Sequence, residues 1–187
     1  YLQYAESFWQ MVKDKHTYIT GGNSEDEHFG ADEVLDGERT VCNNETCNTY
    51  NMLKLSRRLF VITGDKKYAD YYENTFINAI MSSQDHKTGL TMYFQPMASG
   101  YQKVFGTLEN SFWCCTGSGM ENFTKLQDSI YFKGKNVIAV NQYLASKATG
   151  DGYVVEQTGD LSKDDTMVFE VSGDKITFNL KLRMPDW

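Results

Sequence analysis

The sequence has few of the residues that mark linkers, membrane segments or histidine-based sites. Two prolines occur in 187 residues, Pro96 and Pro185, so no proline-rich linker is expected between domains. Its apolar runs are only a few residues long, which excludes a transmembrane helix. The first six residues have neither the basic nor the apolar stretch of a signal peptide, so none is expected in this chain, and the compartment stays open.

Basic residues are fewer than acidic ones. The 18 Lys and Arg against 25 Asp and Glu give a formal net charge of −7. An acidic surface does not attract phosphate groups, so neither nucleic acid nor an anionic membrane is an expected partner. Aromatic residues are abundant, with 12 Tyr, 11 Phe and 3 Trp. Such rings suit a packed core first, and they also suit the flat faces of sugars.

The spacing of apolar residues predicts helices early in the chain and strands late in it. Helical spacing covers 1–12, 46–63, 66–81 and 119–132, and a short strand is possible at 90–94. Gly64 is placed to end the second helix and Asp65 to cap the third. Alternation with β-branched residues predicts strands at 137–143, 153–157, 167–171 and 175–183. Helices followed by strands indicate an α+β chain or two segregated domains.

The four cysteines stand in two tight groups, and their spacing allows more than one interpretation. Cys42 and Cys47 are five residues apart, and Cys114 and Cys115 are adjacent. A disulfide between adjacent cysteines is strained, but pairing between the two groups is possible. Alternatively, Glu45 with the Cys47, Cys114 and Cys115 thiolates would complete a tetrahedral zinc site. Spacing alone leaves disulfides, free buried thiols and zinc open.

Three segments together resemble a known enzyme family. They are TGGNS at 20–24 with EHF at 27–29, ETCNTYNMLKL at 45–55, and SFWCCTGSGMEN at 111–122. In this order and approximate spacing they resemble the β-L-arabinofuranosidases of glycoside hydrolase family 127 and its relative, family 146. The resemblance runs from near Tyr1 to about Phe132 and continues more weakly to LKLRMPDW at 180–187.

The resemblance implies a fold that is mainly α and then β. Residues 1–133 would form part of an (α/α)6 barrel that carries the catalytic region, and residues 134–187 would begin a β-sandwich. Twelve barrel helices of roughly eleven residues need well over 200 residues with their loops. At 187 residues the chain is therefore expected to hold an incomplete barrel and not a whole active site.

The resemblance also implies a reaction and a set of site residues. The reaction would be retaining hydrolysis of terminal β-L-arabinofuranosyl units, and the partner an L-arabinose-containing plant glycan. Cys114 would be the nucleophile and Glu27 the general acid/base. The ligands of Zn²⁺ would be Glu45, Cys47, Cys114 and Cys115, and the residues that contact the sugar would be His28, Glu73 and Tyr93.

Simpler interpretations apply to the same residues. Glu27 lies in an acidic run that is typical of a solvated loop, and Glu73 has the place of a surface residue on a helix. His28 is equally compatible with a structural histidine. Cys42 has no role in the family pattern but could replace Cys47 as a ligand. The alternative function is a non-catalytic structural-zinc or carbohydrate-binding module.

Overall fold

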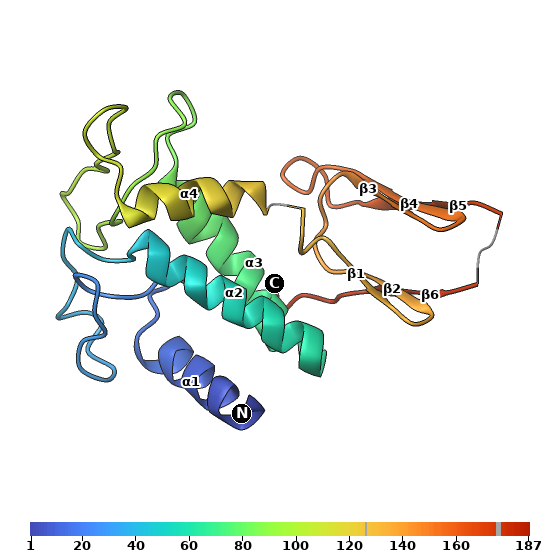
Figure 1. Cartoon of the computed structure of the whole chain (residues 1–187), viewed down its shortest axis with the longest axis horizontal. Coiled ribbons are helices and arrows are strands. Elements are labelled where there is room, and N and C mark those ends of the chain that lie inside the picture. The colour runs from blue at the N-terminus through green and yellow to red at the C-terminus, as the bar shows by residue number, and fades with distance from the viewer. Residues whose placement is uncertain (126, 175–176) are drawn as a thin grey trace. The chain divides into compact units, whose positions relative to one another are not determined.

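The computed structural model describes residues 1–125, 127–174 and 177–187. The chain forms two compact units, residues 1–124 and 125–187. Figure 1 shows helices and long loops in the first unit and short strands in the second. No helix in the described residues is long and apolar enough to cross a membrane.

The first two helices follow the predicted pattern. Helix α1 (Leu2–Lys15) buries Trp9 and Val12, and it runs beyond the predicted range of 1–12. Helix α2 (Thr46–Thr63) has the predicted bounds. It ends at Gly64, whose φ of 69° lies in the left-handed region and whose N–H donates to the Phe60 carbonyl. Glycine reaches this conformation without a Cβ clash, so it ends the helix cleanly.

The third predicted helix is present but changes its winding. Helix α3 (Lys66–Thr75) begins after Asp65, whose side chain accepts a hydrogen bond from the Lys67 N–H. It continues as a π-helical turn, Phe76–Ile80, and a 3₁₀ turn, Met81–Ser83. Turns of the π type inside helices frequently lie at functional sites. The predicted helix over 66–81 is therefore confirmed in extent, although its last turns are not α-helical.

One aromatic-rich core joins these three helices. Trp9 of α1 lies edge-on to Tyr68 and Tyr71 of α3, with ring centroids 4.7 and 5.4 Å apart. Its indole N–H donates to the Ser56 hydroxyl of α2 at 2.7 Å. The buried members of the core are Trp9, Val12, Met52, Leu53, Leu59, Tyr68, Tyr71, Tyr72, Phe76 and Ile80. This core holds α2, and with it the residues where α2 begins.

The fourth helix differs from the prediction. Helix α4 (Cys114–Thr124) starts earlier than residue 119 and ends well before residue 132. Ile130 lies in a turn, and Leu126, which the predicted helix contained, lies outside the described residues. Residues 131–134 pair with another strand instead, so strand pairing overrides the helical spacing there. The short strand predicted at 90–94 is wrong, since only isolated bridges at Thr91 and Met92 occur.

The second unit contains two three-stranded sheets. In one, β1 (Tyr131–Gly134), β2 (Val137–Val140) and β6 (Asn179–Leu182) lie in the order β1-β2-β6, with β2 and β6 parallel. In the other, β3 (Ser146–Gly150), β4 (Tyr153–Thr158) and β5 (Val168–Ser172) are antiparallel. The predicted strands overlap β2, β4, β5 and β6, whereas β1 and β3 were not predicted. Residues 175 and 176 of the last predicted strand lie outside the described residues.

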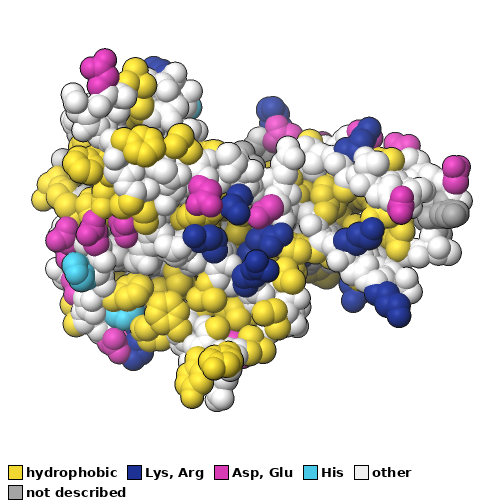
Figure 2. Space-filling model, in the orientation of Figure 1, with side chains coloured by type: hydrophobic (Ala, Val, Ile, Leu, Met, Phe, Trp, Pro, Cys, Tyr) yellow, Lys and Arg dark blue, Asp and Glu magenta, His cyan; other side chains and the backbone are white. Residues whose placement is uncertain are grey.

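Several hydrophobic side chains of α1 remain exposed. Tyr4 is 80% exposed and Phe8 is 46% exposed. Figure 2 shows hydrophobic side chains gathered over this helix. A group of exposed hydrophobic side chains of this kind usually marks a surface that contacts something else.

Candidate functional site

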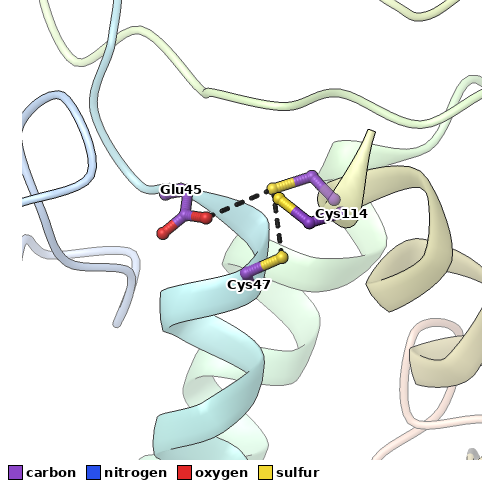
Figure 3. A group of neighbouring side chains, drawn as sticks. Glu45, Cys47 and Cys114 are labelled. Carbon is purple, nitrogen blue, oxygen red and sulfur yellow. Dashed lines mark hydrogen bonds between the residues drawn. The ribbon is translucent and has the colours of Figure 1, made fainter. Parts of the chain in front are cut away.

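Two helices begin at the same place and bring four potential metal ligands together. Glu45 immediately precedes α2 and Cys47 lies in its first turn, whereas Cys114 and Cys115 open α4. One ligand atom from each residue lies within 4.8 Å of all the others. Cys115 Sγ is 3.5 Å from Glu45 Oε1 and 3.4 Å from Cys47 Sγ. Figure 3 shows Glu45, Cys47 and Cys114 pointing toward one another from the two helix starts.

Backbone hydrogen bonds from two loops hold the start of α2. The Glu45 N–H donates to the Ser24 hydroxyl at 3.1 Å, and the Thr46 N–H donates to the Tyr93 carbonyl at 3.0 Å. The Thr46 hydroxyl donates to the Met92 carbonyl at 2.9 Å. Glu45 is the N-cap of α2, but its side chain makes no capping hydrogen bond. Its carboxylate is therefore available to the cysteines of α4.

The electrostatics of the cluster favour anionic ligands and a cation. The N-terminus of a helix carries a partial positive charge, so both helix starts stabilise thiolates and a carboxylate. Burial, more than any other cause, raises the pKa of the Cys115 thiol above its ordinary value, and burial also raises that of Cys47. Without a cation these two thiols are consequently protonated at neutral pH. A bound metal would displace their protons.

The donor set and its spacing fit a zinc ion. Four ligands at the usual Zn–S distance form a tetrahedron whose edges are about 3.8 Å. The contacts of 3.4 and 3.5 Å and the outer limit of 4.8 Å bracket that value. All four cysteines are free, and Cys42 is not part of the cluster. Cys47, and not Cys42, is therefore the member of the first cysteine pair that belongs to this group of potential ligands.

A tight turn presents Glu27. Glu25 and His28 exchange two backbone hydrogen bonds of 2.9 Å, and the two residues between them, Asp26 and Glu27, have φ values of 50° and 67°. Non-glycine residues in this left-handed region cost about 1–2 kcal/mol each and tend to occur at functional sites. The Asp26 N–H donates to the Cys42 carbonyl at 2.8 Å, which ties the turn to the segment leading into α2. Glu27 is exposed on this turn.

The Tyr93 hydroxyl links Glu27 to the cysteine cluster. It donates a hydrogen bond to Glu27 Oε1 and lies 3.4 Å from Cys114 Sγ. These two contacts raise the pKa of the Tyr93 phenol, first through Cys114 and then through Glu27. Cys114 is exposed, whereas Cys115 and Glu45 are buried. The cluster therefore has a closed side and an accessible side, and the accessible sulfur is the one in contact with Tyr93.

Comparison with known families decides to which one the chain belongs. The sequence profile described as β-L-arabinofuranosidase, GH127 catalytic domain, matches residues 1–128. The chain belongs to glycoside hydrolase family 127. No curated protein sequence matches it significantly.

Solved structures share the fold over the whole chain. The chain is similar to Ara127N-Se, a family 127 β-L-arabinofuranosidase from Geobacillus stearothermophilus T6, with 23% identity and a TM-score of 0.80, covering 100% of this chain and 32% of that one. It is similar to the family 127 β-arabinofuranosidase BT3674 with 25% identity and a TM-score of 0.87, covering 100% and 30%. A third structure, a glycoside hydrolase, has 21% identity and a TM-score of 0.71, covering 96% and 35%. The chain thus spans about a third of the length of these relatives.

The remaining residues expected from the family 127 resemblance lie at different depths. His28 is exposed and follows Glu27 directly in the turn. Glu73 is only 7% exposed and lies on α3, beside core residues. Burial of a carboxylate on a helix is unusual, so Glu73 is not the simple surface residue of the alternative interpretation. Its contact with a sugar stays a prediction, as does that of His28.

Two residues around the cluster were not predicted. Ser24 accepts the Glu45 N–H, and it lies in the TGGNS segment with a φ of 87°. Ser118 Oγ lies 3.0 Å from Cys47 Sγ. Ser118 stands four residues after Cys114, and residues four apart share one face of a helix. Once residues 114–118 are known to be helical, that spacing identifies Ser118.

Proposed function

We propose that this chain carries the catalytic residues of a retaining glycosidase that releases terminal β-L-arabinofuranosyl units. In this proposal Cys114 is the nucleophile and Glu27 is the general acid/base. The observation that carries it is the position of one hydroxyl, that of Tyr93, in contact with both Glu27 and Cys114. The second support is the membership of the chain in family 127.

The separation between the two reactive groups favours retention. Two hydrogen-bond lengths through one oxygen limit the distance between the Glu27 carboxylate and Cys114 Sγ to about 6 Å. Retaining glycosidases place their two groups about 5–5.5 Å apart, whereas inverting enzymes need about 6.5–9.5 Å to admit a water molecule. The short bridge therefore supports direct attack by a side chain.

The reaction would proceed in two steps. In the first, Cys114 Sγ forms a bond to the anomeric carbon, the bond from that carbon to the leaving oxygen breaks, and Glu27 gives its proton to that oxygen. In the second, the ionised Glu27 takes a proton from water, the water oxygen bonds to the anomeric carbon, and the carbon–sulfur bond breaks. The exposure of Cys114 leaves its sulfur accessible for both steps.

We assign Glu45, Cys47, Cys114 and Cys115 as the ligands of Zn²⁺. When bound, zinc would keep the thiols deprotonated at neutral pH. Cys115 and Glu45 are buried and would anchor the site from the protein side. Tyr93, by contacting both Glu27 and Cys114, would orient the two groups on either side of the sugar.

The substrate in this proposal is an L-arabinose-containing plant glycan or oligosaccharide. His28, Glu73 and Tyr93 would contact the sugar. The helices of residues 1–133 would form part of an (α/α)6 barrel, and the strands of residues 134–187 would begin a β-sandwich. The exposed apolar face of α1 supports a larger helical assembly around it.

The decisive experiment compares Cys114→Ser and Glu27→Gln with Cys42→Ser in the full-length protein. We expect kcat on an aryl β-L-arabinofuranoside to fall by at least about 10³-fold in the first two variants, because a nucleophile or an acid/base is removed. Cys42 is outside the cluster, so Cys42→Ser is expected to keep both its activity and its zinc. Full activity of Cys114→Ser would refute the proposed mechanism. A protein that binds zinc through these residues but hydrolyses no arabinofuranoside would instead be the non-catalytic module.

A further inference from the structure

The Ser118 side chain contacts one sulfur atom of the cluster, that of Cys47. Its hydroxyl oxygen lies 3.0 Å from Cys47 Sγ. Among the described residues, Cys47 is the only hydrogen-bond partner of that hydroxyl. Ser118 lies one helical turn after Cys114 on α4, so the helix that carries the proposed nucleophile also carries the group that contacts Cys47.

The neighbouring sulfur has a different environment. The Tyr93 hydroxyl has a single proton, and that proton is donated to Glu27 Oε1. While Glu27 is ionised, the contact of 3.4 Å between the Tyr93 hydroxyl and Cys114 Sγ therefore supplies no hydrogen bond, whereas a protonated Glu27 leaves the Tyr93 proton free for Cys114. A thiolate that accepts a hydrogen bond holds its electrons more tightly and is the weaker nucleophile. With a metal bound, Cys47 would be in that state through its contact with Ser118.

We propose that Ser118 is a positioning residue that donates to Cys47 Sγ and keeps Cys47 as a permanent metal ligand. By reducing the electron density on Cys47, Ser118 lowers the reactivity of this sulfur toward the substrate carbon. This inference rests on the proposed function, because it assumes the metal centre and the role of Cys114. It gives a role to a residue that lies within the third sequence motif but to which the family resemblance assigned none.

The test measures Co²⁺ binding to the full-length protein in three variants. Ser118→Ala removes the donor, Ser118→Thr keeps a hydroxyl at the same position, and Thr124→Ala removes a hydroxyl from the same helix. The Thr124 hydroxyl donates to the Glu121 carbonyl, outside the cluster, so it serves as the matched control. Alanine is a better helix former than serine, so Ser118→Ala is expected to fold.

We expect Ser118→Ala to weaken Co²⁺ binding about 10–100-fold, as loss of an outer-shell partner typically does. We also expect the thiolate-to-Co²⁺ charge-transfer band to move to longer wavelength, because a sulfur without its hydrogen bond gives up its electrons more easily. A merely structural role for Ser118 would not move that band. Ser118→Thr is expected to restore both properties, and Thr124→Ala is expected to match the wild type.

Two results would overturn the inference in distinguishable ways. If Ser118→Ala matches Thr124→Ala in both affinity and band position, Ser118 does not act on Cys47, although the metal centre stands. If the wild-type protein binds no Co²⁺, the metal centre itself fails, and the inference fails with it.

Discussion

Gly119 lets α4 approach the segment that carries Tyr93. A Cβ atom built at Gly119 would lie 2.7 Å from both Thr91 Cγ2 and Thr91 Oγ1, and 2.9 Å from Thr91 Cβ. Real Cβ atoms essentially never approach heavy atoms this closely. Thr91 is 9% exposed, and its β-branched side chain has few rotamers into which to move. Gly119→Ala would therefore push α4 away from residues 91–93.

The same helix offers a matched control for this substitution. Gly117 has no atom within 4 Å of a built Cβ. Alanine within a helix is more favourable than glycine by about 1 kcal/mol, and this gain applies to both positions. Overpacking of a close contact costs about 1–3 kcal/mol, and this cost applies only at Gly119. We therefore expect Gly119→Ala to be less stable than Gly117→Ala by about 1–3 kcal/mol.

Urea unfolding of the two variants measures this difference directly. Zinc affinity provides a second measurement, because Cys114 and Cys115 lie on the helix that would move. We expect Gly117→Ala to keep the zinc affinity of the wild type and Gly119→Ala to lose affinity. If the two variants unfold at the same urea concentration and bind zinc equally, α4 does not pack against Thr91 as described.

Two further predictions concern stability. Tyr71 is buried and donates to the Gly21 carbonyl at 2.8 Å, and burial raises the pKa of its phenol to about 12, whereas an unfolded tyrosine ionises near pH 10. Because the pKa of Tyr71 is higher in the folded protein, the stability linked to it is complete below pH 10 and falls by up to about 3 kcal/mol as the pH rises to 12. Urea unfolding at pH 9 and 11.5 measures this loss of stability. It should occur in the control Tyr101→Phe, which changes an exposed tyrosine, but not in Tyr71→Phe. Zinc at 100 times its dissociation constant should stabilise the protein by about 2.7 kcal/mol, and a chelator should remove this gain. Thermal melts should show the gain in Cys42→Ser but not in Cys47→Ser, and the reverse pattern would make Cys42 the ligand.

The sequence predicted those helices whose own apolar residues have helical spacing. Apolar residues at helical spacing and the left-handed Gly64 were enough to predict both ends of α2. Helix α4 was placed wrongly because its first turns contain cysteine, glycine and serine but no large apolar residue. The close approach of Gly119 to Thr91 within this helix is a tertiary contact that the sequence pattern does not show. Strand β3 is similar, since residues 146–150 have no large apolar side chain and form a strand only through pairing with β4.

The candidate site, like the fold, could be predicted only where its residues lie close together in the sequence. The four residues expected as ligands came from the family resemblance, whose motifs contain each pair, and the structure brings all four together. The bridge from Glu27 through Tyr93 to Cys114 joins residues 66 and 21 positions apart in the chain. No pattern among neighbouring residues in the sequence predicts a contact between residues so far apart. Tyr93 was expected at the sugar, but its position in contact with both Glu27 and Cys114 comes only from the fold.

Within the proposed mechanism, differences in burial favour Cys114 as the nucleophile more than differences in charge do. All three thiols lie at the positive end of a helix, so the helix dipoles stabilise each thiolate and do not select one of them. Cys115 is buried and Cys47 is half-buried against Ser118, whereas Cys114 is exposed beside Tyr93. A sulfur that must reach a carbon of the substrate has to be accessible, and a sulfur that must stay on a metal benefits from burial. Exchanging these two environments, without changing the number of ligands, would therefore turn a catalytic centre of this kind into a structural one.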